Sequence, residues 1–432
     1  MNYEYLIGFR YLRSKRKQKF VSVIGLISIL GVFIGVMALN VVLGVMKGFE
    51  DELKNKILGV SSHLVVLNYD GPIENYRFIE EEIRSMNGVI GTSPFIYGQG
   101  MLRSDTGVTG TEVWGINPEN AGNVSLIDEA VGKGSLQEDK DNNKDIYKLL
   151  GKEILNKLNE NTETGKPPII LGKELIKNLH LSIGDVVSLI SPFGKIGPFG
   201  PTAKVKRYEI IGISDFGLVD ADSKYSYMSL NNAMDYFDIN GRVSGVGISI
   251  ANIYDSKLLS KSINSKLGFP FYTRNWEDVN KSLFKALQLE RIAIAIFLGF
   301  IILVAALNIV STLTMLVMEK SKDIAILRAM GSKKHEILKI FVIDGMIIGL
   351  VGTLLGSVMG FFICYLLKTN DVIKSLIPFD SQVYPVSEFP VKIEPLYFIT
   401  IAIASMFICL LATLYPSIQA SRRDPIEALR YE

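Results

Sequence analysis

Four long apolar stretches, each bounded by charged residues, dominate the pattern of the chain. The first runs from Phe20 to Met46 and the second from Ile292 to Met318, and neither contains a charged side chain. As a helix the first stretch is about 40 Å long, whereas the hydrocarbon core of a bilayer is about 30 Å thick. We therefore predict four transmembrane helices. They cover residues 20–48, 291–318, 340–367 and 395–418.

Residues 49–290, between the first two predicted spans, have the composition of a soluble domain. Short runs rich in β-branched and aromatic residues alternate with turn residues, and helical patterns intervene. We therefore predict a mixed α+β domain inserted into a four-helix membrane protein. The predicted strands are 63–69, 89–102, 111–116, 168–171, 185–191, 204–213 and 244–250, and the predicted helices are 78–86, 173–179, 231–236 and 256–267.

Two segments of this domain depart from that pattern. Residues 132–166 are polar and dense in charge, which predicts a partly helical excursion on the surface. Residues 191–202 contain three prolines and three glycines, which fix turns and interrupt strand pairing. The second segment is either a hairpin tip folded back on its domain or a protruding loop that presents Phe193, Ile196 and Phe199 to a partner.

Basic residues gather in three places: residues 1–19, the connection 319–339 and the tail 419–432. Positive charge is retained on the cytosolic side of a membrane, so we expect both termini in the cytosol. The domain 49–290 and the short loop 368–394 then lie on the outer side. The first segment also suits an amphipathic helix on an anionic membrane surface.

Small residues in the predicted spans indicate close helix packing, because glycines at a spacing of four let backbones approach. These packing glycines are Gly31, Gly35, Gly349, Gly352, Gly356 and Gly360. Asp344 stands near the cytosolic end of the third span. An acid at that depth is expected to pair with an arginine or a lysine.

The cytosolic connection 319–339 contains a short helical pattern that ends at Gly331, with Ser332 in position to cap the next helix. One interpretation is a solvated loop whose charge fixes orientation. The other is a helix that docks a cytosolic partner, because Ile324, Ile326, Leu327 and Met330 would give it an exposed apolar surface.

Signs of enzymatic chemistry are absent from the sequence. It has no G-x-x-x-x-G-K-[ST] loop, no H-E-x-x-H pair and no G-x-S-x-G turn. Cys364 and Cys409, the two cysteines, both fall inside apolar stretches and are expected to be buried thiols. We therefore expect no catalytic residues, no metal site and no cofactor bound by this chain. Nucleic-acid binding is not expected either, because the basic N-terminus adjoins a membrane span.

The segment Asp323–Gly331, which reads D-I-A-I-L-R-A-M-G, resembles the E-I-(A/G)-I-L-R-A-x-G signature of FtsX/MacB-type permeases. In that superfamily this segment is the coupling helix, which sits in a groove of an ABC-type ATPase. The order of one span, a large outer domain and three further spans is the layout of the same superfamily. The resemblance assigns ATPase coupling to Asp323, Ile324, Ile326, Leu327, Arg328, Met330 and Gly331.

Finer matches resemble the LolC/LolE group of lipoprotein-releasing permeases. They include Val42–Phe49, Thr413–Ser417 and the terminal stretch Asp424–Glu432. The proline-rich segment falls where LolC-type proteins carry a hook that receives the periplasmic carrier LolA. By this resemblance the carrier-binding residues are Pro192, Phe193, Ile196, Pro198, Phe199, Pro201 and Lys206, and Lys204 and Lys206 would guide an acidic carrier edge.

The resemblance implies a multi-pass permease of a Gram-negative inner membrane that extracts lipoproteins from membrane lipid and passes them to the LolA-like carrier. A LolD-like ATPase subunit would hold ATP and magnesium, and a second permease subunit would complete the complex. Two alternatives remain open at this point. One is an FtsX/MacB-like permease that only transmits mechanical force, and the other is a membrane-anchored scaffold or receptor without an ATPase.

Overall fold

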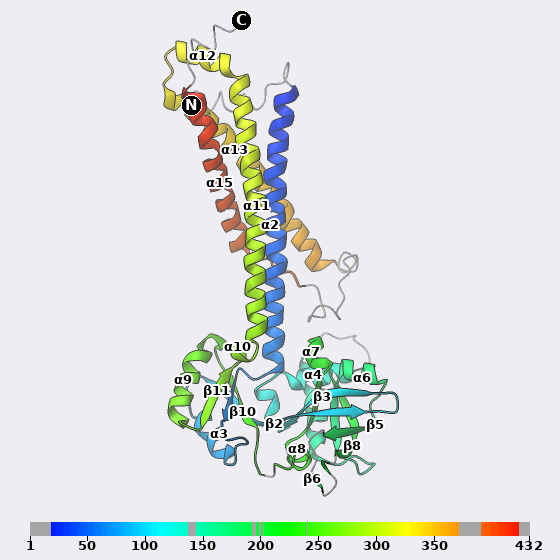
Figure 1. Ribbon diagram of the computed structural model, residues 1–432. Coiled ribbons are helices and arrows are strands. Elements are labelled where there is room, and N and C mark those ends of the chain that lie inside the picture. Colours follow the sequence, from blue (N-terminus) through cyan, green and yellow to red (C-terminus); the bar gives the residue numbers. More distant parts are fainter. Residues whose placement is uncertain are drawn as a thin grey trace. The chain divides into compact units, whose positions relative to one another are not determined.

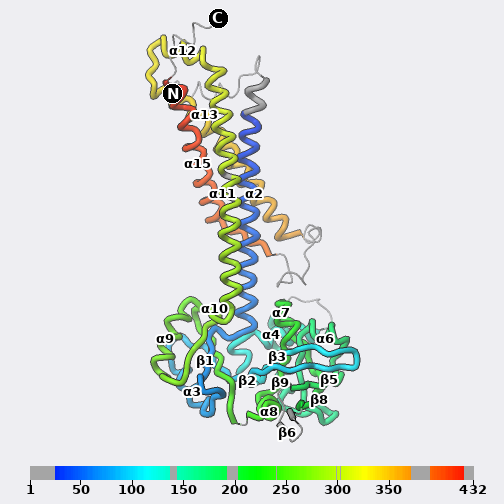
Figure 2. Tube along the Cα trace, viewed as in Figure 1, coloured from blue at the N-terminus to red at the C-terminus, as the bar shows by residue number. Residues whose placement is uncertain are grey.

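The computed structural model describes residues 19–136, 144–191, 196–197, 200–201, 203–239, 241–370 and 390–422 (Figure 1, Figure 2). The predicted N-terminal amphipathic segment, most of the outer loop and the end of the tail lie outside these residues. The chain divides into two compact units. Asp51–Phe284 form an α/β unit, and the helical segments before Asp51 and after Phe284 form the other.

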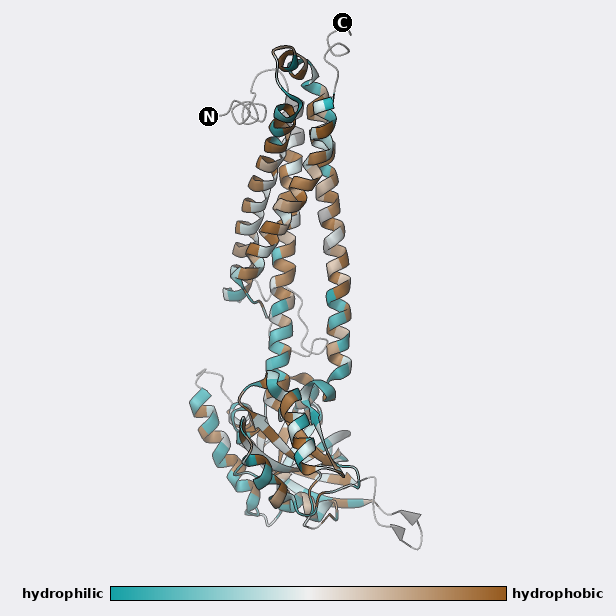
Figure 3. Cartoon of the chain, turned by 90° about the vertical axis from the view of Figure 1, so that its left-hand side faces the viewer, coloured by the Kyte–Doolittle hydropathy of each residue, from teal (hydrophilic) through white to brown (hydrophobic). Residues whose placement is uncertain are grey.

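The helical unit is built from four long helices and one short one. The long helices are α2 (Lys19–Val60), α11 (Lys281–Glu319), α13 (Lys334–Thr369) and α15 (Pro395–Arg422), and the short one is α12 (Ser321–Ala329). By length and composition, each long helix can cross a membrane. Figure 3 shows them as hydrophobic over most of their length.

Two of these helices continue well past the predicted spans. Helix α2 ends at Val60, twelve residues after residue 48, and α11 begins at Lys281, ten residues before residue 291. The extensions contain many lysine, glutamate and leucine residues, which favour helix regardless of polarity. The predicted spans cover only the apolar part of each helix, because hydropathy does not register its polar continuation.

The α/β unit is organised around a nine-stranded sheet in the order β11-β1-β10-β2-β3-β9-β4-β8-β5. A further pairing joins β2 to β5, so the six strands from β2 to β5 close on themselves. The strands are β1 (Leu64–Asn68), β2 (Val89–Arg103), β3 (Val108–Ile116), β4 (Pro168–Gly172), β5 (Val186–Ser191), β8 (Lys204–Ser214), β9 (Tyr225–Ser229), β10 (Gly245–Ile250) and β11 (Phe271–Asn275).

Helices pack on the sheet in two hydrophobic clusters. The larger cluster includes Ile83, Tyr208 and Tyr236, and the smaller one joins Ile127 and Leu155 to sheet residues. The α-helices are α3 (Tyr76–Arg84), α4 (Ile127–Ser135), α5 (Lys144–Asn156), α6 (Lys173–Leu179), α7 (Val219–Asp222), α8 (Leu230–Tyr236), α9 (Ser256–Leu267) and α10 (Trp276–Val279), and short 3₁₀ turns cover Ala121–Asn123, Lys157–Asn159 and Ile253–Asp255.

All the strands and helices predicted in this unit have a counterpart within a few residues. The segment 132–166 is partly helical, as predicted, but it is more than a surface excursion. Helix α5 lies within it and buries Tyr147, Ile154 and Leu155. Its backbone packs directly on α4, because a Cβ added to Gly151 would lie 1.7 Å from the carbonyl oxygen of Asp128. The polar residues of this segment form one face of an amphipathic helix whose other face belongs to the core.

Candidate functional site

Helix α12 presents two different faces. Ile324 and Ala325 are buried, and Ile324 belongs to the same apolar cluster as Ile337 and Ile340 of α13. The expectation that Ile324 is exposed is therefore wrong, because the helix needs an apolar side with which to pack on its own bundle. Leu327 is partly buried against the same cluster. These contacts hold α12 on the helical unit.

The opposite face of α12 is apolar and exposed. Ile326 and Met330 lie one helical turn apart, and 51% and 80% of their surfaces are accessible. Asp323, whose side chain is about half exposed, pairs with Lys320 across 3.7 Å. The exposed pair Ile326 and Met330 is named here the α12 patch.

A compact reversal joins α12 to α13. The N–H of Gly331 donates to the carbonyl of Arg328 and the N–H of Ser332 to that of Leu327, each at 3.1 Å. Gly331 has a φ of 99°, as a glycine that ends a helix in this way requires. Ser332 was predicted to cap α13, but the N-cap residue is Lys333, whose N–H donates to the Glu336 carboxylate at 2.9 Å.

The glycines of α13 face two neighbouring helices. A Cβ added to Gly352, Gly356 or Gly360 would lie 2.7–2.8 Å from atoms of α2, and one added to Gly349 would lie 2.8 Å from Cys409 of α15. Side chains at these positions would push the helices apart. Helix α13 therefore makes backbone-close contacts with both α2 and α15.

Helices α2 and α11 also pack at small residues. A Cβ on Gly31 would lie 3.1 Å from the Asn308 amide, and one on Gly35 would lie 3.4 Å from Ile301. The hydroxyl of Ser28 on α2 is hydrogen-bonded to that of Thr312, which lies one turn after Asn308 on α11. The polar Asn308 near the middle of α11 therefore faces α2 within the unit.

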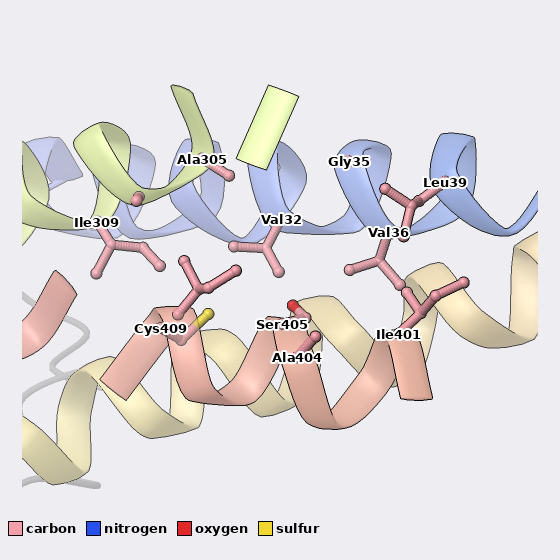
Figure 4. Close-up of a pocket in the computed structure, with 12 residues that line it drawn as sticks. Val32, Gly35, Val36, Leu39, Ala305, Ile309, Ile401, Ala404, Ser405 and Cys409 are labelled. Atoms are coloured by element: carbon pink, nitrogen blue, oxygen red, sulfur yellow. The ribbon is translucent and has the colours of Figure 1, made fainter. Parts of the chain in front are cut away.

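A small apolar cavity of about 40 Å³ lies between α2, α11 and α15 (Figure 4). Val32, Ile309 and Cys409 project toward it, and Ser405 supplies the one hydroxyl of its lining. The remaining lining residues are Gly35, Val36, Leu39, Ala305, Ala306, Ile401, Ala404 and Ile408. A dry space of this size leaves room for side-chain rearrangement between the helices.

Asp344 of α13 is fully buried in the helical unit. Neither of its carboxyl oxygens has a hydrogen-bond partner, and no ion pair to it occurs among the described residues. The expected arginine or lysine partner is therefore not found in the described part of the chain.

The predicted hook joins β5 to β8 and contains the short pair β6 (Ile196–Gly197) and β7 (Gly200–Pro201). In that pair Ile196 stands opposite Pro201, and Gly197 stands opposite Gly200. Pro192, Phe193, Pro198 and Phe199 lie outside the described residues. Strand β5, from which the hook departs, is paired on both edges, with β8 and with β2.

The two lysines at the base of the hook are paired within their own domain. Lys206 Nζ lies 2.7 Å from Asp235 Oδ2, and Lys204 Nζ lies 3.0 Å from Asp238 Oδ1. The hydrogen bond from Lys206 holds the pKa of Asp235 below its usual range. Asp235 of α8 and Asp238, two residues after that helix, thus supply a counter-charge to each lysine, and the role of Lys206 in carrier binding stays a prediction.

Sequence reasoning missed an acidic pair at the connection between β8 and α7. Asp215 Oδ2 lies 2.9 Å from Lys173 Nζ and 3.5 Å from Lys133 Nζ, and these lysines lower its pKa although burial opposes them. Asp222 is buried, and its Oδ1 accepts the N–H of Phe216 at 2.9 Å. Burial raises the pKa of Asp222 to about 6, and the nearby Asp215 adds to that rise.

Among the described residues, no cluster of three or more histidine, cysteine, aspartate or glutamate side chains could hold a metal ion. The described residues do offer close helix packing and the exposed α12 patch.

Comparisons with known proteins cover nearly the whole chain. Residues 295–425 match the family model of the FtsX-like permease C-terminal region, and residues 26–265 match that of the MacB-like periplasmic core domain. The second match spans more than half of the chain.

Several relatives that match along nearly their full length are transmembrane proteins of lipoprotein-releasing systems. The lipoprotein-releasing system transmembrane protein LolC of Neisseria meningitidis is 30% identical over 431 residues, covering 99% of this chain and 98% of the relative. LolC of Xylella fastidiosa is 27% identical over 430 residues, with coverages of 99% and 98%. LolE of Haemophilus influenzae is 27% identical over 443 residues and covers 99% of each chain.

Proposed function

Because this chain belongs to the family of lipoprotein-releasing transmembrane proteins that includes LolC and LolE, we propose that it is the permease subunit of an ABC transporter for lipoproteins. It would reside in the inner membrane with its α/β unit in the periplasm. It would extract lipoproteins from the outer leaflet and pass them to a LolA-like carrier. A second permease subunit, homologous or identical, would complete the membrane part.

The observation that carries this proposal is the two-faced character of α12. The buried Ile324 holds the helix on the bundle, while the exposed Ile326 and Met330 form an apolar surface larger than a tether requires. An apolar helix face of this kind fits a groove on a LolD-like ATPase. The short reversal at Gly331 would pass a displacement of α12 directly to α13.

The energetics of the cargo explain why such coupling is needed. Each methylene of an acyl chain removed from lipid costs about 0.8 kcal/mol, so a lipoprotein with several chains does not leave the membrane at a useful rate. ATP and magnesium would bind on the partner ATPase. The permease would convert closure of that partner into movement of its helices.

The test replaces the α12 patch by charge with the double substitution Ile326→Asp and Met330→Asp. Both side chains are exposed, so the bundle keeps its packing, while the apolar surface is lost. We expect the ATPase to dissociate during purification of the full complex in detergent, and transport-linked ATP turnover to fall with it.

The matched control places two aspartates one turn apart on the exposed side of α13, at His335 and Lys339. This control should retain the ATPase. Co-purification and ATP turnover that are unchanged by the α12 substitutions would refute the coupling role.

A further inference from the structure

A buried carboxyl group without a partner is costly inside a membrane protein, whether it is charged or neutral. Asp344 is 0% exposed, and among the described residues neither of its oxygens has a hydrogen-bond partner. Its neighbours one turn away on α13, Ile340 and Ile348, are buried and apolar. A donor or acceptor within reach of this carboxyl must therefore be sought on the helices packed against it.

Helices α13 and α15 run antiparallel, which places Asp344 at a definite level of α15. A Cβ added to Gly345 would lie 1.9 Å from Thr413, and one added to Gly349 would lie 2.8 Å from Cys409. Moving four residues toward the C-terminus of α13, from Gly345 to Gly349, therefore corresponds to moving four residues toward the N-terminus of α15, from Thr413 to Cys409. Asp344 lies at the level just beyond Thr413 in the direction of Pro416.

A backbone acceptor that lacks its intrahelical donor lies at that same level. Pro416 is inside α15 and has no N–H, so the carbonyl of Ala412 lacks its donor four residues ahead. That carbonyl points along the helix axis toward Pro416, and Ala412 is buried. The hydroxyls of Thr413 and Ser417 do not serve it, because they donate to the carbonyls of Leu410 and Thr413 at 2.7 and 2.6 Å.

We propose that Asp344 is a protonated positioning residue whose O–H donates to the Ala412 carbonyl left free by Pro416, joining α13 to α15. The proposal requires a rotation of the Asp344 side chain that brings the two groups together. The neutral acid supplies the one donor that the carbonyl lacks, whereas a carboxylate has only acceptors. Because α13 directly follows α12, this bond makes α15 move with α13.

The two native cysteines provide the assay. Cys409 lies on α15 against Gly349, and the chain has one other cysteine, Cys364. In the full chain carrying Cys364→Ala, the rate at which a thiol-reactive dye labels Cys409 in detergent reports separation of α13 from α15. The chain is compared with Asp344→Leu and Asp344→Asn in that background.

The leucine variant cannot donate, so Cys409 should be labelled about threefold to twentyfold faster, the range expected for an interhelical hydrogen bond in a membrane protein. The asparagine variant keeps an N–H donor and should be labelled at the original rate. Adding Pro416→Ala returns an N–H to the Ala412 carbonyl. The leucine substitution should then no longer accelerate labelling.

Each departure from this pattern overturns the proposal. If asparagine accelerates labelling as much as leucine, Asp344 acts as a charged group that pairs with a cation. If leucine leaves labelling unchanged or slows it, the carboxyl makes no bond that holds the helices. If Pro416→Ala fails to suppress the leucine effect, the Ala412 carbonyl is not the partner.

Discussion

Asp222 is predicted to make the stability of the α/β unit depend on pH. Its carboxyl is buried at the start of the chain segment that leads into β9, and burial raises its pKa from 3.8 to about 6. In the unfolded chain the group ionises near pH 4. Replacing it by asparagine removes the titration and keeps an oxygen that can accept the N–H of Phe216.

The sign follows from the raised pKa. Below pH 3.8 the carboxyl is protonated in both states and contributes no pH dependence. Between pH 3.8 and about 6 the unfolded chain ionises while the folded chain does not, so the protein loses stability as the pH rises. The full loss is about 3 kcal/mol, from about two pKa units at 1.36 kcal/mol each, and it remains constant above pH 6.

Tryptophan fluorescence can isolate this unit within the full chain. Trp114 and Trp276, the two tryptophans of the chain, both belong to the α/β unit. Urea unfolding of the wild type and of Asp222→Asn, at pH values from 4 to 8, gives the difference in stability at each pH. As the pH rises from 4 to 8, the free energy of unfolding of Asp222→Asn should increase by about 3 kcal/mol relative to that of the wild type. This corresponds to a shift on the order of 1 M in the urea midpoint.

The matched control is Asp220→Asn on the same short helix, where the exposed carboxylate pairs with Lys224. That pair contributes at most about 1 kcal/mol, so its replacement should change the pH profile little. A difference between wild type and Asp222→Asn that stays constant from pH 4 to 8 would refute the reasoning, because burial would then not perturb this carboxyl.

Two further predictions concern the α4–α5 contact and the hook. Gly151→Ala should lower the free energy of unfolding of the α/β unit by about 3 kcal/mol in the same fluorescence assay, because the new methyl group meets backbone atoms that cannot rotate away; Gly110→Ala, at an open position, is the control, and equal midpoints would contradict the packing. Deletion of Phe193–Gly200 should leave ATPase binding and turnover intact and abolish lipoprotein transfer from proteoliposomes to the carrier; transfer at the original rate would contradict a role for the hook.

The long helices could be predicted from the length of their apolar stretches alone. A helix that is apolar all round needs no 3.6-residue period to be recognised. The apolar pattern also predicted the strands whose residues are β-branched. Strand β9 was missed because its sequence, Tyr225–Ser229, alternates aromatic and small residues over only five positions. Helix α4 was missed because two glycines, Gly132 and Gly134, weaken its helical pattern, yet each lies against neighbouring backbone and could not be larger.

The direction of individual side chains could not be read from the sequence. The sequence of α12 does not show which of its apolar residues face the bundle and which face outward. Ile324 is buried because it packs in one cluster with Ile337 and Ile340 of α13. The counter-charges of Lys204 and Lys206 come from α8 and the residues just after it, about 30 residues later, so their pairing depends on the fold. Asp222 ends the short helix α7 in a polar stretch of sequence, and its burial arises from tertiary contacts.

The double pairing of β5 has a consequence for how this family can diversify. The strand is held by β8 on one edge and by β2 on the other, so the ladder ends at Ser191 and Lys204 whatever lies between them. Selection can therefore lengthen, shorten or rewrite the intervening residues without disturbing the fold that supports them. We therefore expect a segment grafted from a relative between these two residues to leave the pairings of β5 with β8 and β2 in place.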